Sequence, residues 1–290
     1  MRRAAVAVVV WQLGFAIADA APSQVTVDAP PALAADASRI RRIDVERLSD
    51  ALRRAGLELP PRVQVTLIPD DDPRAQRVPR WFAGLAIGAD DIVIFPERVS
   101  SYPYDSIETV FRHEVVHLAL DGRAAGQPLP RWFHEGTAVA VESGWSVTDQ
   151  VRLLLATATE PAVEDVARLF ESPTEPQSAH AYLLAAALMD ELRRAHGAAL
   201  PGRVAAEVAR GVPFDRAFAS QTGLSPNDAA RGAWRSYRRW TSWVPAATGP
   251  ASTWSLILGL AFVAFFVRIW RRARRRRQWD EEENGPDPVT

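Results

Sequence analysis

Three residues whose chemistry belongs together lie within one short segment, where His113 is followed directly by Glu114 and, three residues later, by His117. On a helix, residues four apart lie one turn apart on the same face, so both imidazoles can bind one metal ion with Glu114 beside them. The flanking residues are mostly apolar, which predicts a buried helix. Two buried histidines need a polar partner, and a metal ion bound at about 2.0–2.1 Å is the simplest one.

A catalytic zinc needs a third protein ligand and an open position. Glu135, which follows His117 by 18 residues, is a candidate, and the small residues Gly136 and Ala138 beside it would let its helix approach the first one closely. His134 is the alternative ligand. Because neighbouring residues on a helix point about 100° apart, only one of His134 and Glu135 can face the metal.

The two motifs together, H-E-x-x-H at residues 113–117 and P-x-W-F-x-E-G-x-A at residues 130–138, resemble the gluzincin clan of zinc metallopeptidases, in particular the small bacterial peptidase MA-like group. The resemblance covers about residues 105–145 and continues more loosely through the helical segment that follows. It implies a zincin-like α+β fold and favours Glu135 over His134 as the third ligand. The implied zinc ligands are His113, His117 and Glu135.

The resemblance also implies roles in peptide hydrolysis. Glu114 would be the general base and would later pass its proton on. Tyr182 is the best available donor for a tetrahedral intermediate, although an ordinary half-buried helical tyrosine explains it equally well. An extended substrate would lie along an edge strand, for which residues 91–95 are the candidate; a plain hydrophobic strand is an equal alternative.

One position departs from the pattern of the better-known gluzincins. Val139 stands where they carry an acidic residue, four positions after the glutamate ligand, that orients the first histidine. Asp121, one turn after His117, and Glu142, two turns after Glu135, are candidates for this role, but either can also be a solvated helix residue.

The elements that must position these residues follow from local patterns. Apolar residues recur every three or four positions over 38–56, which predicts a helix, and alternation over 62–68 predicts a strand. Residues 82–95 predict two short strands joined around 88–91. A helix capped by Asp105 or Ser106 is expected to end at Asp121-Gly122, a second helix runs over 132–143, and further helices fill 147–240. The sequence thus predicts a small mixed sheet, an active-site helix and a mostly helical C-terminal half.

The two ends of the chain predict a membrane protein. Residues 1–20 resemble a cleaved signal peptide, with Arg2 and Arg3 before a short apolar run. Residues 246–270 predict one transmembrane helix, because they are followed by an arginine cluster typical of the cytoplasmic side. The expected remaining parts are a linker (21–36), the metallopeptidase domain (37–242) and a cytoplasmic tail (271–290). The chain would then cross a bacterial inner membrane once, with its domain facing the periplasm or the cell exterior and its C-terminus in the cytoplasm.

Composition narrows the function further. The 290 residues include no cysteine, which excludes cysteine-ligated zinc, thiol catalysis and disulfides. The formal net charge of −1, and a mildly acidic exported part, argue against a nucleic-acid partner. We predict a membrane-anchored zinc metallopeptidase acting on peptides or proteins. The alternatives are a catalytically silent zincin-fold domain for binding or scaffolding, and a purely structural membrane-associated helical protein.

Overall fold

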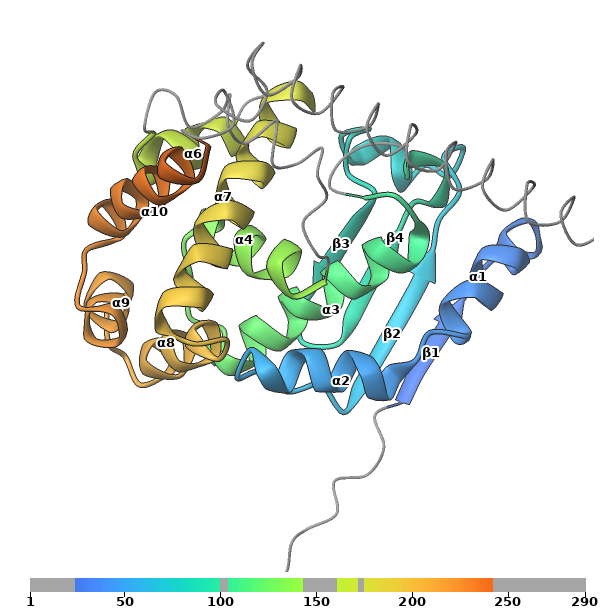
Figure 1. Cartoon of the computed structure of the whole chain (residues 1–290). Coiled ribbons are helices and arrows are strands. Elements are labelled where there is room, and N and C mark those ends of the chain that lie inside the picture. The colour runs from blue at the N-terminus through green and yellow to red at the C-terminus, as the bar shows by residue number, and fades with distance from the viewer. Residues whose placement is uncertain (1–23, 100–103, 143–160, 172–174, 242–290) are drawn as a thin grey trace, which may run out of the picture.

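A computed structural model of the chain describes residues 24–99, 104–142, 161–171 and 175–241 (Figure 1). The strands are β1 (Gln24–Asp28), β2 (Arg62–Leu67), β3 (Gly84–Ile87) and β4 (Asp91–Ile94). The helices are η1 (Pro31–Leu33), α1 (Ala34–Arg41), α2 (Val45–Arg54), η2 (Ala75–Arg77), η3 (Pro96–Arg98), α3 (Ile107–Arg123), α4 (Arg131–Glu142), α6 (Val163–Phe170), α7 (Glu175–His196), α8 (Leu200–Ala209), α9 (Phe214–Thr222) and α10 (Pro226–Thr241). The described part is therefore an α+β fold with a small sheet and a mostly helical second half.

The sheet has four strands in the order β1-β2-β4-β3, in which β1, β2 and β4 are parallel and β3 runs antiparallel to β4. In β2, the alternating residues Val63, Val65 and Leu67 are buried, which is why this segment forms a strand at the centre of the core. The strands expected over 62–68 and within 82–95 are confirmed, and so is the mixed sheet.

The strand order corrects one expectation. Residues 91–95 were the candidate edge strand, but β4 lies between β2 and β3 and has a partner on both sides. The edge strand beside the active-site segment is β3, which contacts α3. The order of strands in a sheet depends on contacts between distant segments, which local patterns do not report.

The predicted linker over 21–36 is also wrong for its described part. Residues 24–28 form β1, which pairs in parallel with β2, and residues 31–36 continue into η1 and the start of α1. Val25 and Val27 are the inward residues of this short strand and pack against the core. The helix expected over 38–56 is likewise two helices, because Asp44 interrupts it and caps α2 by accepting a hydrogen bond from the backbone N–H of Arg47.

Three helices hold the centre of the fold. Helix α3 packs on the sheet, and α4 lies between α3 and α7 (Figure 1). Ser106 caps α3 through the backbone N–H of Thr109, and Ala124 is its C-cap, so the helix expected from Asp105 or Ser106 onward is confirmed. The helix expected over 132–143 is α4, which begins one residue earlier.

Several predicted segments lie outside the described residues: the signal peptide (1–20), the transmembrane helix (246–270) and the tail (271–290). Among the helices that the structure does describe, none combines the length and the apolar character needed to cross a bilayer.

The close approach of α4 to α7 gives a stability prediction. A Cβ on Gly136 would lie 2.8 Å from the carbonyl carbon of Ala185, and closer still to its oxygen. We expect Gly136→Ala to reduce the free energy of unfolding by about 1–3 kcal/mol, measured by urea denaturation, because two backbones must move apart. Gly232→Ala in α10 is the control: its Cβ meets nothing within 4 Å, and we expect it to stabilise the helix by about 0.5–1 kcal/mol. Equal effects of the two substitutions would contradict the packing argument.

Candidate metal centre

The two histidines of the motif lie on the face of α3 that is turned toward α4. The His113 side chain is 1% exposed and that of His117 is 12% exposed, with their rings 4.7 Å apart. This burial follows from the sequence around them, because Val110, Phe111 and Val115 belong to the core. The apolar faces of α3 thus hold the imidazoles away from solvent.

Glu135 comes from the second turn of α4 and meets both histidines. Its Oε2 lies 3.2 Å from Nε2 of His113 and 3.3 Å from Nε2 of His117. Ligands at about 2.0–2.1 Å from a tetrahedral ion would be separated by about 3.3 Å. The three donor atoms all lie within 4.8 Å of one another, so this group fits a metal ion both in chemistry and in spacing.

The charges around Glu135 favour its ionised form. Burial alone would raise the pKa of this carboxyl, but the charge of His117 and hydrogen bonds with both histidines hold it well below the ordinary value. Arg131, one turn earlier on α4, places its Nε 3.4 Å from the Oε1 of Glu135 and donates from Nη1 to the carbonyl of Phe170 at 3.0 Å. An ionised carboxylate is the form that binds a metal.

Glu114 is buried in the same region but in a different electrostatic setting. Burial raises the pKa of its carboxyl well above the ordinary value, and the nearby Glu135 charge raises it further, against a hydrogen bond from the backbone N–H of Ala86 in β3. Gly84 makes this approach possible, since a Cβ there would lie 2.7 Å from the Oε1 of Glu114. Burial therefore makes this carboxyl a stronger base than an ordinary glutamate, beside the group that could hold a metal ion.

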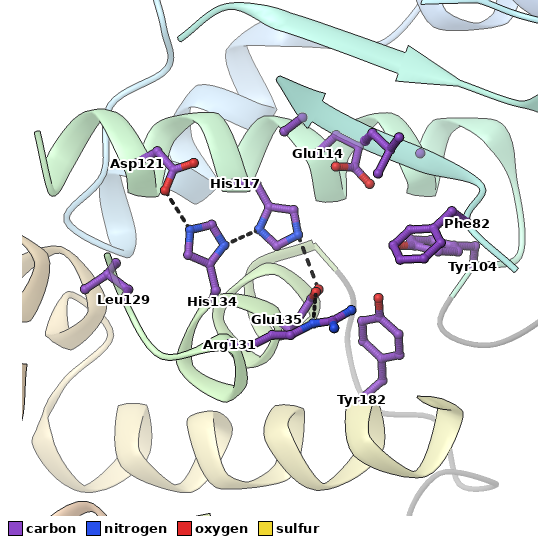
Figure 2. A pocket seen from close by; sticks show the side chains of 13 residues that line it. Phe82, Tyr104, Glu114, His117, Asp121, Leu129, Arg131, His134, Glu135 and Tyr182 are labelled. Carbon is purple, nitrogen blue, oxygen red and sulfur yellow. Dashed lines mark hydrogen bonds and ion pairs between the residues drawn. The ribbon is translucent and has the colours of Figure 1, made fainter. Parts of the chain in front are cut away.

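These side chains line one cleft of about 300 Å³ (Figure 2). Its walls come from β3, α3, α4 and α7, and from the loops around them. The lining residues are Phe82, Gly84, Leu85, Ala86, Tyr104, Glu114, His117, Asp121, Leu129, Arg131, His134, Glu135 and Tyr182. The cleft therefore opens directly onto the carboxyl groups of Glu114 and Glu135 and onto His117, whereas His113 is not among its lining residues.

Two tyrosines meet in this cleft. Burial raises the pKa of Tyr182 and of Tyr104 well above the ordinary value, so both hydroxyls keep their protons. A hydrogen bond joins the two hydroxyl groups. Figure 2 shows the hydroxyl of Tyr182 directed into the cleft.

His134 occupies a different place from Glu135. Its Nδ1 lies 2.6 Å from Nδ1 of His117, on the side of that ring away from Glu135, and its Nε2 lies 2.8 Å from Oδ1 of Asp121. Of the two candidates for the acidic orienting role, Asp121 thus contacts His134, whereas the side chain of Glu142 lies outside the described part. Val139, one turn after Glu135 on α4, is buried.

The structure brings three predicted ligands together and places Glu114 and Tyr182 on the walls of the same cleft. Their catalytic roles stay predictions. Sequence reasoning missed Tyr104 and Arg131; Arg131 stands inside the second motif, one helical turn before Glu135, and that spacing was the available signal.

Comparisons with protein-family models, with curated proteins and with solved structures give no significant match for this chain.

The raised pKa of Glu114 gives a pH-dependent prediction for the chelator-treated chain. A carboxyl whose pKa is higher in the folded state than its ordinary 4.5 binds its proton more tightly when folded, so its contribution to stability falls as pH rises above 4.5. Glu114→Gln removes this loss and still accepts the bond from Ala86. We expect the variant to have a higher Tm than the unsubstituted chain at pH 7, with the difference shrinking toward pH 4.5.

Glu108→Gln is the control of opposite sign. Burial would raise the pKa of Glu108, but its hydrogen bonds with Arg39 hold it below the ordinary value, so its stabilisation is present above pH 4.5 and lost as pH falls. This substitution should lower Tm at pH 7. A Glu114→Gln variant that is no more stable than the unsubstituted chain at pH 7 would contradict the electrostatic account of the cleft.

Proposed function

We propose that this chain is a zinc-dependent metallopeptidase that hydrolyses peptide bonds in peptide or protein substrates. The observation that carries the proposal is the convergence of His113, His117 and Glu135 beside a buried Glu114. Two imidazoles and one carboxylate with an open position are typical of catalytic zinc, whereas structural sites use four protein ligands. No further His, Cys, Asp or Glu joins this group among the residues that the structure describes.

The ligands and Glu114 have separable tasks in such a reaction. Zinc, when bound, supplies Lewis acidity, which lowers the pKa of a water and polarises a carbonyl group. Glu114 takes the proton from the attacking water and passes it to the nitrogen of the leaving amine. A raised pKa suits this task, because burial makes the carboxylate of Glu114 a stronger base than an ordinary glutamate.

Tyr182 is proposed to donate a hydrogen bond to the oxygen that becomes negative during the reaction. Its hydroxyl stays protonated because burial raises its pKa, and it lines the cleft beside Glu135. A donor that is already oriented and shielded from water stabilises developing charge without reorganisation.

The edge strand β3 is proposed to bind the extended substrate. Gly84, Leu85 and Ala86 line the cleft, and on the sheet side the strand pairs only with β4 within the described residues. A peptide can therefore add to this edge by main-chain hydrogen bonds. Anchoring of the chain in a bacterial inner membrane through residues 246–270, with the domain in the periplasm, is part of the proposal.

Metal content and cleavage test the proposal together. We expect one zinc per chain by mass spectrometry on the full chain purified without chelator, and cleavage of a peptide library by the same sample. Glu135→Ala should lose the zinc, because only two protein ligands, His113 and His117, would remain and a zinc site needs at least three. Glu114→Gln should keep the zinc but lose cleavage. Glu108→Gln, the control in the same helix, should change neither.

The outcomes separate the candidate functions. An unsubstituted chain without zinc would overturn the metal site. Zinc without any cleavage would overturn the peptidase and favour the catalytically silent zincin-fold domain for binding or scaffolding. Cleavage that survives Glu114→Gln would remove the general base from the mechanism.

The role of Tyr182 is tested by removing its hydroxyl alone. We expect Tyr182→Phe to lower kcat by about 100-fold, with KM and zinc content unchanged, because the bond forms in the transition state. Tyr237→Phe on α10 is the control, since that hydroxyl donates to the carbonyl of Ala187 and does not line the cleft. An unchanged kcat for Tyr182→Phe would show that Tyr182 serves packing only.

A further inference from the structure

We propose that Asp121 and His134 position the metal ligand His117 through a chain of two hydrogen bonds, which fixes the nitrogen that His117 turns toward the metal. The proposal rests on the metal site of the proposed function. It assigns no contact with metal or substrate to Asp121 or His134; both act through His117.

The geometry of the three side chains is continuous (Figure 2). Oδ1 of Asp121 lies 2.8 Å from Nε2 of His134, and Nδ1 of His134 lies 2.6 Å from Nδ1 of His117. The two imidazole planes are inclined by 30°, with centroids 4.6 Å apart. The remaining nitrogen of His117, Nε2, faces Glu135 at 3.3 Å. Each nitrogen of the two rings thus has one polar neighbour.

When a metal ion takes the place of the hydrogen bonds between Glu135 and the histidines, both imidazoles are neutral, and the donors and acceptors along these two hydrogen bonds can then be assigned in only one order. The carboxylate of Asp121 can only accept, so Nε2 of His134 carries the hydrogen and donates it. Nδ1 of His134 is then an acceptor, and the hydrogen between the two rings belongs to Nδ1 of His117. Nε2 of His117 is left with its lone pair directed at the metal-ligating group, which is the tautomer that metal binding requires.

The same two helices that supply the metal ligands also supply the residues of these two hydrogen bonds. Asp121 lies one turn after His117 on α3, and His134 directly precedes Glu135 on α4. The docking of α4 on α3 therefore sets the ligand Glu135 and the positioning residue His134 at once. His113 has a different setting, with the ring of Tyr104 edge-on at 5.1 Å. The two hydrogen bonds accordingly position His117 and leave His113 unaffected.

This arrangement also supplies an acidic group that Val139 does not, at the position where the better-known gluzincins carry an acidic residue. An acidic group that orients a metal-bound histidine is present in the cleft, but it comes from α3 and reaches the second histidine through His134. Partners of this kind raise the basicity of the ligand and restrict its ring, and their removal typically weakens metal binding by 10–100-fold.

The test compares zinc affinities of full-length chains by competition with a chromophoric chelator. We expect His134→Phe, which keeps a ring of similar size without nitrogen, to bind zinc about 10–100-fold more weakly. Asp121→Asn should also weaken binding. In the double variant the effects should be less than additive, because both substitutions break one chain. His196→Phe and Asp50→Asn, which change residues away from the cleft, should bind zinc like the unsubstituted chain.

A rescue variant separates positioning from packing. In His134→Asn, the side-chain oxygen takes the place of Nδ1 and can still accept from His117, so we expect affinity closer to that of the unsubstituted chain than to that of His134→Phe. The visible spectrum of the cobalt(II)-substituted chain should change in His134→Phe and much less in His134→Asn. If His134→Phe does not fold, as judged by circular dichroism, Asp121→Asn and His134→Asn carry the comparison.

Three results would overturn the inference. Zinc affinities within twofold of the unsubstituted chain for both His134→Phe and Asp121→Asn would show that the chain does not position His117. Affinity lost equally in His134→Asn and His134→Phe would show that only packing of the ring matters. An unsubstituted chain that binds no zinc would overturn the proposed metal site, and this inference with it, which distinguishes that failure from the other two.

Discussion

The candidate centre depends on how deeply helix α4 packs between α3 and α7. Glu135 reaches both histidines of α3 because the next residue, Gly136, lets the backbone of α4 approach that of α7 at Ala185. A side chain at Gly136 would push α4 away, and a displacement of about 1 Å is enough to spoil a site of this kind. The same contact sets the hydrogen bond between His134 and His117, so ligand and positioning residue depend on one packing constraint.

The packing of these helices shifts the pKa values of two buried carboxyl groups, Glu135 and Glu114, in opposite directions. Glu135 faces His113 and His117 and stays ionised, whereas Glu114 faces β3 and receives one backbone N–H, so burial dominates and its pKa rises. Paired carboxyls whose environments separate their pKa values are how active sites divide the roles of ligand and base. The separation follows from where each side chain lies: Glu135 points at the imidazoles, whereas Glu114 is turned toward the strand, where burial and the charge of Glu135 raise its pKa.

The local elements of this fold could be predicted from the sequence because their signals are local. The cap at Ser106 and the apolar periodicity define α3, and alternation defines β2. The strand order, β1 at residues 24–28 and the break at Asp44 could not be predicted in the same way, since they depend on pairing partners or on a single capping contact. The spacing of the motifs predicts that His113, His117 and Glu135 lie together, but it does not predict the hydrogen bonds of His134 with Asp121 and His117.

The positions of the polar groups indicate that a metal ion bound at the candidate centre would couple its binding to folding. Glu114, Glu135 and Asp121 bring three carboxyl groups to one cleft, and among the described residues that line it Arg131 is the one arginine. A divalent cation bound by His113, His117 and Glu135 adds the opposite charge at the point where the carboxylates converge, and it binds the folded chain alone, because the ligands come from two helices. Such a cation therefore stabilises the packing of α3 against α4 by mass action. The packing of α3 against α4, which brings the ligands together, would thus be stabilised further by a bound metal ion.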